Sequence, residues 1–215
     1  FFRQVTVLAG AGVGGGSLVY ANTLPIPKSY FFQFPSWSHL ANWEEELAPH
    51  YKEARRMMGA TQTPFLTRPD KILRKVAEKR GQLDAFESTH TAVFYGTPGR
   101  TVPDPYFDGE GPDRTGCIQC GACMTGCKHG AKNTLDKNYL YLARKLGLTI
   151  EADTEVTHIR PLPEGGYEVT ALYGAKLWGR KKKVYRTKKL IMSAGVLGTV
   201  DLLLDLSTKQ DGLPK

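Results

Sequence analysis

Apolar residues recur at helical spacing in several parts of the chain, and this pattern predicts four helices. Their expected ranges are 42–56, 69–80, 134–146 and 196–206. The first helix begins at the candidate cap Asn42, and its acidic first turn complements the helix dipole, although Pro49 interrupts the pattern. The second helix presents one apolar face, made of Ile72, Leu73, Val76 and Ala77.

Apolar and polar positions alternate in the last third of the chain, which predicts mostly β-structure there. The expected strands are 148–152, 155–160, 167–173 and 184–193, with a tight turn at 164–166. Near the start, a strand at 5–9 precedes a glycine loop at 10–16 and a short helical stretch at 17–24, which two prolines end. Together these elements predict an α/β (α+β) fold with a mixed or antiparallel β region near the C-terminus.

Two further segments are predicted to be loops. The aromatic-rich stretch 30–37 is expected to pack on the core as a loop, with the lining of an apolar cavity as the alternative. Five glycines and prolines between 97 and 112 predict an exposed loop.

Composition places the chain among ordinary globular proteins. It has 215 residues, of which 41% are hydrophobic and 23% charged, and this excludes collagen-like, coiled-coil and wholly disordered classes. No run of about 18 uncharged apolar residues is present, so we expect no membrane span. No signal-peptide pattern is visible, and we expect a cytoplasmic protein.

The net charge of +8 arises largely from one basic run over 180–189. We interpret this run as the solvated turn of a hairpin, with an anion-binding patch as the alternative. We expect no nucleic-acid partner.

The four cysteines fall within eleven residues, at Cys117, Cys120, Cys123 and Cys127. This C-x2-C-x2-C-x3-C spacing is that of a bacterial ferredoxin run, and the intervening glycines permit a loop that wraps a compact centre. A single [4Fe–4S] cluster is the first interpretation. Tetrahedral zinc, two local disulfides and free structural thiols are the alternatives.

The glycine loop matches G-x-G-x-x-G over 10–15, but the match departs from a primary dinucleotide fingerprint. The helix that follows is short, and no acidic residue stands about 20 positions further on. We therefore predict a loop that contacts a cofactor in another role, with a tight loop without ligand as the alternative.

Four blocks in the same order resemble the glucose–methanol–choline (GMC) oxidoreductases, most closely their bacterial cholesterol-oxidase-like branch. They are Gly12-Val13-Gly14-Gly15-Gly16-Ser17-Leu18-Val19, the segment from Gly130 to Leu140 (GAKNTLDKNYL), Val156 in Thr154-Glu155-Val156-Thr157, and the segment from Leu190 to Thr199 (LIMSAGVLGT). The resemblance implies that the chain is an internal fragment forming the middle of an FAD-binding fold, with a Cys-rich loop.

The resemblance also implies which residues contact FAD. These are Gly12, Gly14, Gly15, Gly16, Ser17, Val156, Ala194 and Gly195. Many relatives have Asn-Gly-Gly where this chain has Tyr20-Ala21-Asn22, so Asn22 is the substitute expected at the flavin ring. The family's catalytic His lies near its C-terminus, so no catalytic residue is assigned here and residues 1–215 alone are expected to be inactive.

The predicted organisation follows from these blocks. Residues 1–30 and 148–215 belong to the FAD-binding domain, 31–112 form a helical and loop region partly on the substrate side, and 113–147 hold the Cys-rich loop and a core helix. The expected reaction is oxidation of the CH–OH group of a small-molecule alcohol, bulky and apolar, such as a sterol, with an unassigned electron acceptor.

Two hypotheses from other classes compete with this interpretation. In one, the cysteines make the protein an iron–sulfur, ferredoxin-like electron-transfer module. In the other, zinc staples a basic nucleic-acid-binding module, which the acidic residues near the cysteines disfavour: Asp104, Asp108, Glu110 and Asp113.

Overall fold

The computed structural model describes residues 10–174 and 179–208. The chain divides into two compact units, Phe1–Leu148 and Thr149–Lys215. The strand predicted over 5–9 lies outside the described residues.

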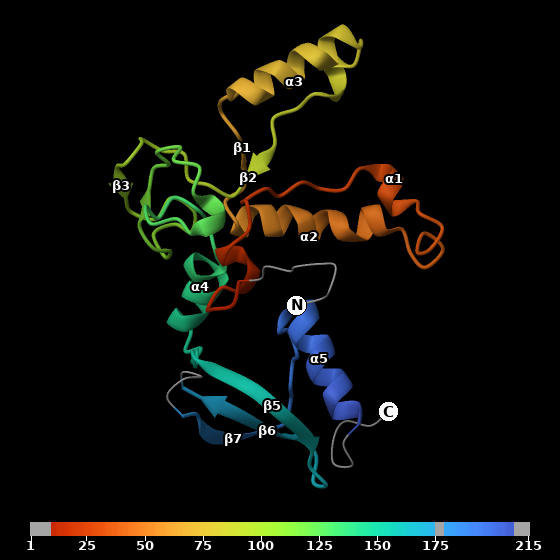
Figure 1. Ribbon diagram of the computed structural model, residues 1–215, viewed down its shortest axis with the longest axis vertical. Helices are drawn as coiled ribbons and strands as arrows, with labels where there is room; N and C mark the ends of the chain where they lie inside the picture. The colour runs from red at the N-terminus through yellow and green to blue at the C-terminus, as the bar shows by residue number, and fades with distance from the viewer. Residues whose placement is uncertain (1–9, 175–178, 209–215) are drawn as a thin grey trace. The chain divides into compact units, whose positions relative to one another are not determined.

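The first unit is mainly helical, with two short antiparallel strand pairs (Figure 1). Its helices are η1 (Gly15–Leu18), α1 (Ser29–Phe32), α2 (Trp43–Met57), α3 (Arg68–Lys79), η2 (Leu83–Ala85), η3 (Cys123–Thr125), η4 (Leu135–Lys137) and α4 (Tyr139–Lys145). Its strands are β1 (Thr61–Gln62), β2 (His90–Thr91), β3 (Thr101–Val102) and β4 (Arg114–Thr115). Pairing of β1 with β2 and of β3 with β4 positions the loops between them.

The two helices predicted first are confirmed as α2 and α3, but their N-termini differ from expectation. The Asn42 side chain does not cap α2; its amide donates to Glu45 Oε2 at 2.9 Å. The helix continues through Pro49. α3 begins with a capping box in which Thr67 and Asp70 satisfy each other's backbone N–H groups.

Three predictions in this unit are wrong in detail. The helix expected at 17–24 is only the single turn η1, and the one expected at 134–146 is split into η4 and α4 at Asn138, whose φ and ψ are −134° and −99°. Asn138 Oδ1 accepts a hydrogen bond from Tyr139 N at 2.6 Å, so this residue caps α4 instead of continuing one helix. The exposed loop expected at 97–112 contains β3.

The aromatic stretch 30–37 forms α1 and the turns after it, and it is not packed on the core as a whole. Phe32 is buried and lies edge-on to Tyr51, whereas Tyr30 is 72% exposed and Phe34 53%. Phe31, Phe34 and Trp37 pack mainly on one another.

The second unit is a three-stranded antiparallel sheet with one helix. The strands β5 (Thr154–Pro161), β6 (Tyr167–Tyr173) and β7 (Lys181–Thr187) pair in sequence order, and α5 (Gly195–Ser207) follows. Ile159, Val169 and Leu206 form its buried core. With the first unit, this sheet confirms the predicted mixed α/β class.

The observed strand bounds show where the basic run 180–189 lies in the fold. β5, β6 and α5 agree with prediction, but 148–152 is not a strand and the last strand ends at Thr187. The basic run therefore contributes to β7 and is not simply a turn, so the first interpretation of it is wrong. Its side chains pair with acids, including Lys183 with Glu151 at 2.6 Å and Arg186 with Glu168 at 3.0 Å.

Within the described part of the chain, no helix is both long enough and apolar enough to cross a bilayer.

Candidate functional site

The glycine loop is an open backbone turn. Gly14 and Gly15 have φ values of 113° and 55°, in the region that favours glycine. The backbone of Gly16 does not have a positive φ, so its conformation does not require glycine. A Cβ built on Gly15 or Gly16 would also meet no atom within 4 Å. The fold therefore does not itself demand glycine at position 16, and the space beside it is free for a ligand.

Ser17 ties this loop to η4, a segment more than a hundred residues later. Its hydroxyl donates to Gly14 O at 2.6 Å and accepts from Leu135 N at 2.9 Å. The Ser17 side chain is thus engaged within the protein, and it fixes the position of the loop.

A pocket of about 340 Å³ lies beside the glycine loop. Its walls are Gly10, Ala11, Leu18, Val19, Thr125, Gly126, Cys127, Thr134, Asp136 and Lys137. Asp136 Oδ1 is buried without a hydrogen-bond partner in the protein. Because a buried acceptor without a donor is costly, this oxygen suits a ligand that brings a hydroxyl group.

Lys132 joins the glycine loop to the cysteine segment. The residue is 1% exposed, and its Nζ donates to Leu18 O at 2.9 Å and to Cys123 O at 2.8 Å. The ammonium also lies 4.7 Å from the ring centroid of Tyr20, whose hydroxyl donates to Asn133 O. Burial lowers the pKa of Lys132 and raises that of Tyr20.

Arg114 supports the same region from β4. It is 1% exposed and donates to Gly130 O at 2.8 Å and to Lys132 O at 3.1 Å. Burial lowers its pKa, and Tyr106 and Asp136 act in the opposite direction. Two buried cations therefore hold the backbone between the cysteines and η4.

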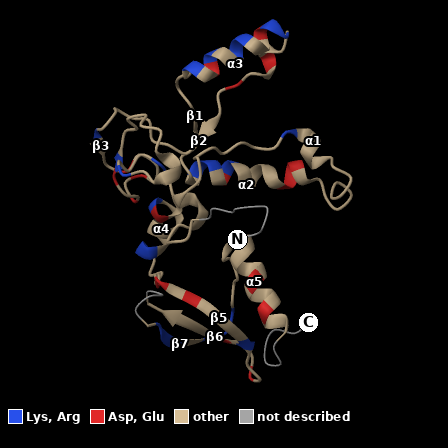
Figure 2. Ribbon diagram, viewed as in Figure 1, with Lys and Arg blue, Asp and Glu red and all other residues tan. Residues whose placement is uncertain are grey.

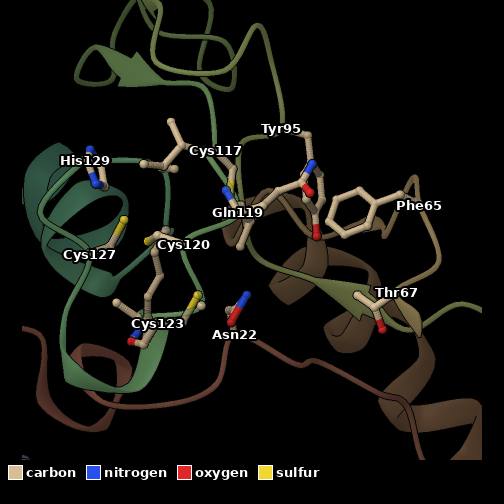
Figure 3. Close-up of a pocket in the computed structure, with 16 residues that line it drawn as sticks. Asn22, Phe65, Thr67, Tyr95, Cys117, Gln119, Cys120, Cys123, Cys127 and His129 are labelled. Atoms are coloured by element: carbon tan, nitrogen blue, oxygen red, sulfur yellow. The ribbon is translucent and has the colours of Figure 1, made fainter. Parts of the chain in front are cut away.

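All four cysteines line one pocket of about 280 Å³ (Figure 3). Phe65, Thr67 and Tyr95 lie on its opposite side from Cys127 and His129. The cysteine segment begins where Cys117 N donates to Phe94 O at 2.9 Å. The backbone turns that bring the thiols to this pocket occur at residues with positive φ: Gln119, Gly121 and Gly126.

The thiols differ in their electrostatic surroundings. Burial and the nearby Cys117 and Cys127 raise the pKa of the Cys123 thiol, and Lys132 partly offsets this. At Cys127, burial acts to raise the pKa, but hydrogen bonds from the backbone N–H groups over 129–132 outweigh it and lower the pKa.

The cysteines are free thiols, so the disulfide alternative does not describe this structure. Across residues 10–174 and 179–208, no three His, Cys, Asp or Glu side chains converge closely enough to hold a metal ion. The predicted ligands thus share a pocket without forming a closed coordination site.

The other predicted site residues fall in different places. Asn22 is 7% exposed with φ 58° and lines the cysteine pocket, beside Cys123 in Figure 3. In the second unit, Val156 is 40% exposed at a register shift of β5. Ala194 is the N-cap of α5, and the adjacent Gly195 has φ 75°.

Sequence reasoning missed the roles of Lys132, Arg114 and Tyr20. No sequence pattern marks Lys132, because the burial of residues 131–134 is visible only in the structure, where a buried cation requires internal partners. Nothing in the sequence around Arg114 distinguishes it from a surface arginine.

Comparison with known proteins gives concordant matches. Residues 111–209 match the family model described as GMC oxidoreductase. The chain is 47% identical to a cholesterol oxidase of Mycobacterium tuberculosis (strain CDC 1551 / Oshkosh) over 209 residues, covering 95% of this chain and 36% of the relative. It is 43% identical to a cholesterol oxidase of Acinetobacter baumannii over 221 residues, covering 99% of this chain and 39% of the relative. The chain thus spans less than two fifths of the length of these curated relatives.

Proposed function

Because the chain belongs to the GMC oxidoreductase family, we propose that the whole protein is an FAD-dependent oxidoreductase acting on the CH–OH group of an alcohol. The observation that carries the proposal is the open glycine loop, within a chain of which 95% and 99% aligns with two cholesterol oxidases, over 36% and 39% of their lengths. At Gly16 the fold leaves space that a side chain would fill.

The residues present fit FAD. We propose that Gly12, Gly14, Gly15, Gly16, Ser17, Asn22, Val156, Ala194 and Gly195 form its contacts. The open backbone at Gly15 and Gly16 supports close approach of the cofactor. The unpartnered Asp136 Oδ1 supports it as well, since the ribose and ribityl portions of FAD carry hydroxyl donors.

When bound, FAD supplies the acceptor for a hydride that leaves the CH–OH carbon. The residues of this chain would bind the cofactor and orient it. Ser17 holds the glycine loop against η4, and Lys132 fixes Leu18 O. Asp136 Oδ1 would accept a hydrogen bond from a hydroxyl group of the cofactor and would take no part in the reaction.

We propose a bulky, apolar alcohol of the sterol class as the substrate. The names of the matched relatives support this class. The exposed rings of Tyr30 and Phe34 supply apolar surface that such a substrate could contact. The electron acceptor is not assigned, and a cytoplasmic location stays a prediction.

The test uses the full-length protein purified aerobically. We expect flavin absorption bands that bleach when a sterol is added without oxygen. Gly16→Val should lose bound flavin while its far-UV circular dichroism is unchanged, because the backbone of Gly16 is unstrained and its surroundings are open. Full flavin content in this variant contradicts the assignment of the loop, and a bound flavin that no alcohol bleaches contradicts the reaction.

We also propose that the four cysteines bind a metal centre. A [4Fe–4S] cluster is the preferred centre, and zinc is the alternative. Their spacing, their common pocket and the backbone N–H groups aimed at the Cys127 thiol support this proposal. The thiols would have to close on the metal from their present positions. Anaerobic purification followed by iron, sulfide and zinc analysis tests it, and metal well below one centre per chain in every preparation contradicts it.

A further inference from the structure

Two pockets of the first unit share part of their walls. The pocket of about 340 Å³ beside the glycine loop is lined by Thr125, Gly126 and Cys127, among other residues. Cys127 also lines the pocket of about 280 Å³ that contains the other three cysteines. The cysteine segment, residues 117–127, thus forms a wall of the space beside the glycine loop, and a change in its conformation alters that space.

Lys132 connects the same two regions directly. Figure 2 shows Lys and Arg on α2, α3 and α4, but among the described residues only Lys132 and Arg114 are both charged and buried. The Lys132 ammonium donates to Leu18 O in η1 at 2.9 Å and to Cys123 O in η3 at 2.8 Å. Because a buried cation is costly without its acceptors, a displacement of η3 also acts on the glycine loop.

The backbone around Lys132 reinforces this connection. The N–H groups over 129–132 form hydrogen bonds to the Cys127 thiol. Arg114 holds the carbonyl oxygens of Gly130 and Lys132 at 2.8 and 3.1 Å. A shift of the Cys127 sulfur therefore acts on the same stretch of backbone that carries the Lys132 ammonium.

Metal binding by the cysteines requires such a shift. In the part of the chain that the structure describes, no three ligating side chains are close enough to hold an ion, so the thiols must converge on it. The segment that moves contains only one helical turn, η3. A bound metal would restrict this segment to one conformation, and a second ligand that contacts the same wall would then pay less to order it.

We propose that metal binding at the four cysteines and FAD binding at the glycine loop are positively cooperative, and that Lys132 carries the coupling. Lys132 is a positioning residue, because it acts through Leu18 and Cys123. The inference rests on the proposed function, since it takes FAD as the ligand of the glycine loop. We expect a coupling factor of about ten-fold, within the range of about 5- to 150-fold that is typical of coupled sites.

The experiment uses the full-length protein, stripped of flavin and metal and kept reduced under anaerobic conditions. The protein is titrated with FAD and followed by flavin fluorescence, without metal and with Zn²⁺ as the probe, because Zn²⁺ binds thiolates and has no redox chemistry. We expect the dissociation constant for FAD to be about ten-fold lower with Zn²⁺.

The reverse titration tests the same coupling without any substitution. It measures the affinity for Zn²⁺ against a competing chelator, in the absence and presence of FAD. The two factors must agree, because linkage between two binding sites is reciprocal. A variant that fails to fold therefore does not remove the test.

Variants identify the residue that carries the coupling. Lys132→Met should bind both ligands with little effect of one on the other, whereas a merely structural role would weaken both affinities and leave the factor unchanged. Lys128→Met is the matched control, since it removes an exposed ammonium beside Cys127, and it should keep the wild-type factor. Cys120→Ser/Cys123→Ser should make the affinity for FAD insensitive to Zn²⁺.

Several outcomes would overturn the inference and leave the proposed function intact. They are an affinity for FAD that Zn²⁺ leaves unchanged or weakens, failure of the wild type to bind Zn²⁺, and an undiminished factor in Lys132→Met or in the double cysteine variant. An equal loss of coupling in Lys128→Met would also overturn it, because it would show a general effect of charge. Absence of FAD binding under every condition would instead contradict the proposed function, and the coupling with it.

Discussion

Replacement of Lys132 by methionine tests whether one buried ammonium holds the glycine loop and the cysteine segment together. Methionine has a similar length and no charge, so the change removes both hydrogen bonds, to Leu18 O and Cys123 O, without opening a large cavity. We expect both segments to open more readily in the variant.

The magnitude follows from these contacts. Two hydrogen bonds from a charged donor contribute about 3–6 kcal/mol, at about 1.5–3 kcal/mol each. Burial of the methionine side chain returns about 1.5–3 kcal/mol. The free energy of local opening should therefore fall by about 2 kcal/mol, which corresponds to a roughly 30-fold increase in amide exchange.

Hydrogen exchange with mass spectrometry on the full-length protein measures this effect. The informative peptides cover 16–20, where Val19 N and Tyr20 N both donate to Gly16 O, and 122–127 around η3. Lys137→Met is the matched control, since Lys137 lies nearby and its Nζ has only a long contact of 3.5 Å to Thr134. Exchange within about two-fold of the wild type in both peptides would refute the reasoning, because it falls far below the change expected from two such hydrogen bonds.

Three further predictions concern the cysteines and the second unit. If the cysteines bind one metal centre, serine at any one of them should lower metal content and thermal stability to a similar extent; effects that pair two and two would instead indicate disulfides. Ile159→Ala should cost about 2–5 kcal/mol in the urea unfolding of the full-length protein, because the side chain is 1% exposed in the core, whereas Val184→Ala, at a residue 47% exposed, should cost far less. Hydrogen bonds from Arg160 and Arg186 lower the pKa of Glu168, so the stability that this carboxylate contributes is present above its usual pKa and is lost as pH falls. The variant Glu168→Gln should therefore lose less stability than the wild type between neutral pH and pH ~3. An identical dependence of stability on pH in the two proteins would contradict the assignment.

Local sequence signals predicted the elements whose stability is local. The pattern predicts β6 at its observed bounds, because its alternation and the glycine turn before it act over a few residues. The pattern places α3 within one residue of its observed bounds, but it does not reach the capping box at Thr67. The pattern identified the apolar face of α3 but not its exposure, since exposure depends on what packs against the helix.

Elements set by contacts distant in sequence could not be predicted in the same way. The helix expected over 134–146 breaks at Asn138, which is buried and donates to Met58 Sδ, a contact across 80 residues. The last strand, β7, begins and ends earlier in the sequence than predicted. Its basic residues form ion pairs with acidic residues on neighbouring segments, which a local pattern does not show. For the site, spacing grouped the cysteines in one pocket, but no local pattern shows that Lys132 reaches back to Leu18.

The contacts around Lys132 also govern when this site can form during biosynthesis. Lys132 and Leu18 are separated by 114 positions, and the bonds from Tyr20 to Asn133 and from Leu135 to Ser17 span 113 and 118. A ribosome adding about 5–20 residues per second takes roughly 6–23 s to make that intervening segment. Until Lys132, Asn133 and Leu135 have also left the ribosome, the glycine loop lacks the partners that fix it. The loop can therefore reach its final conformation only after η4 has been synthesised.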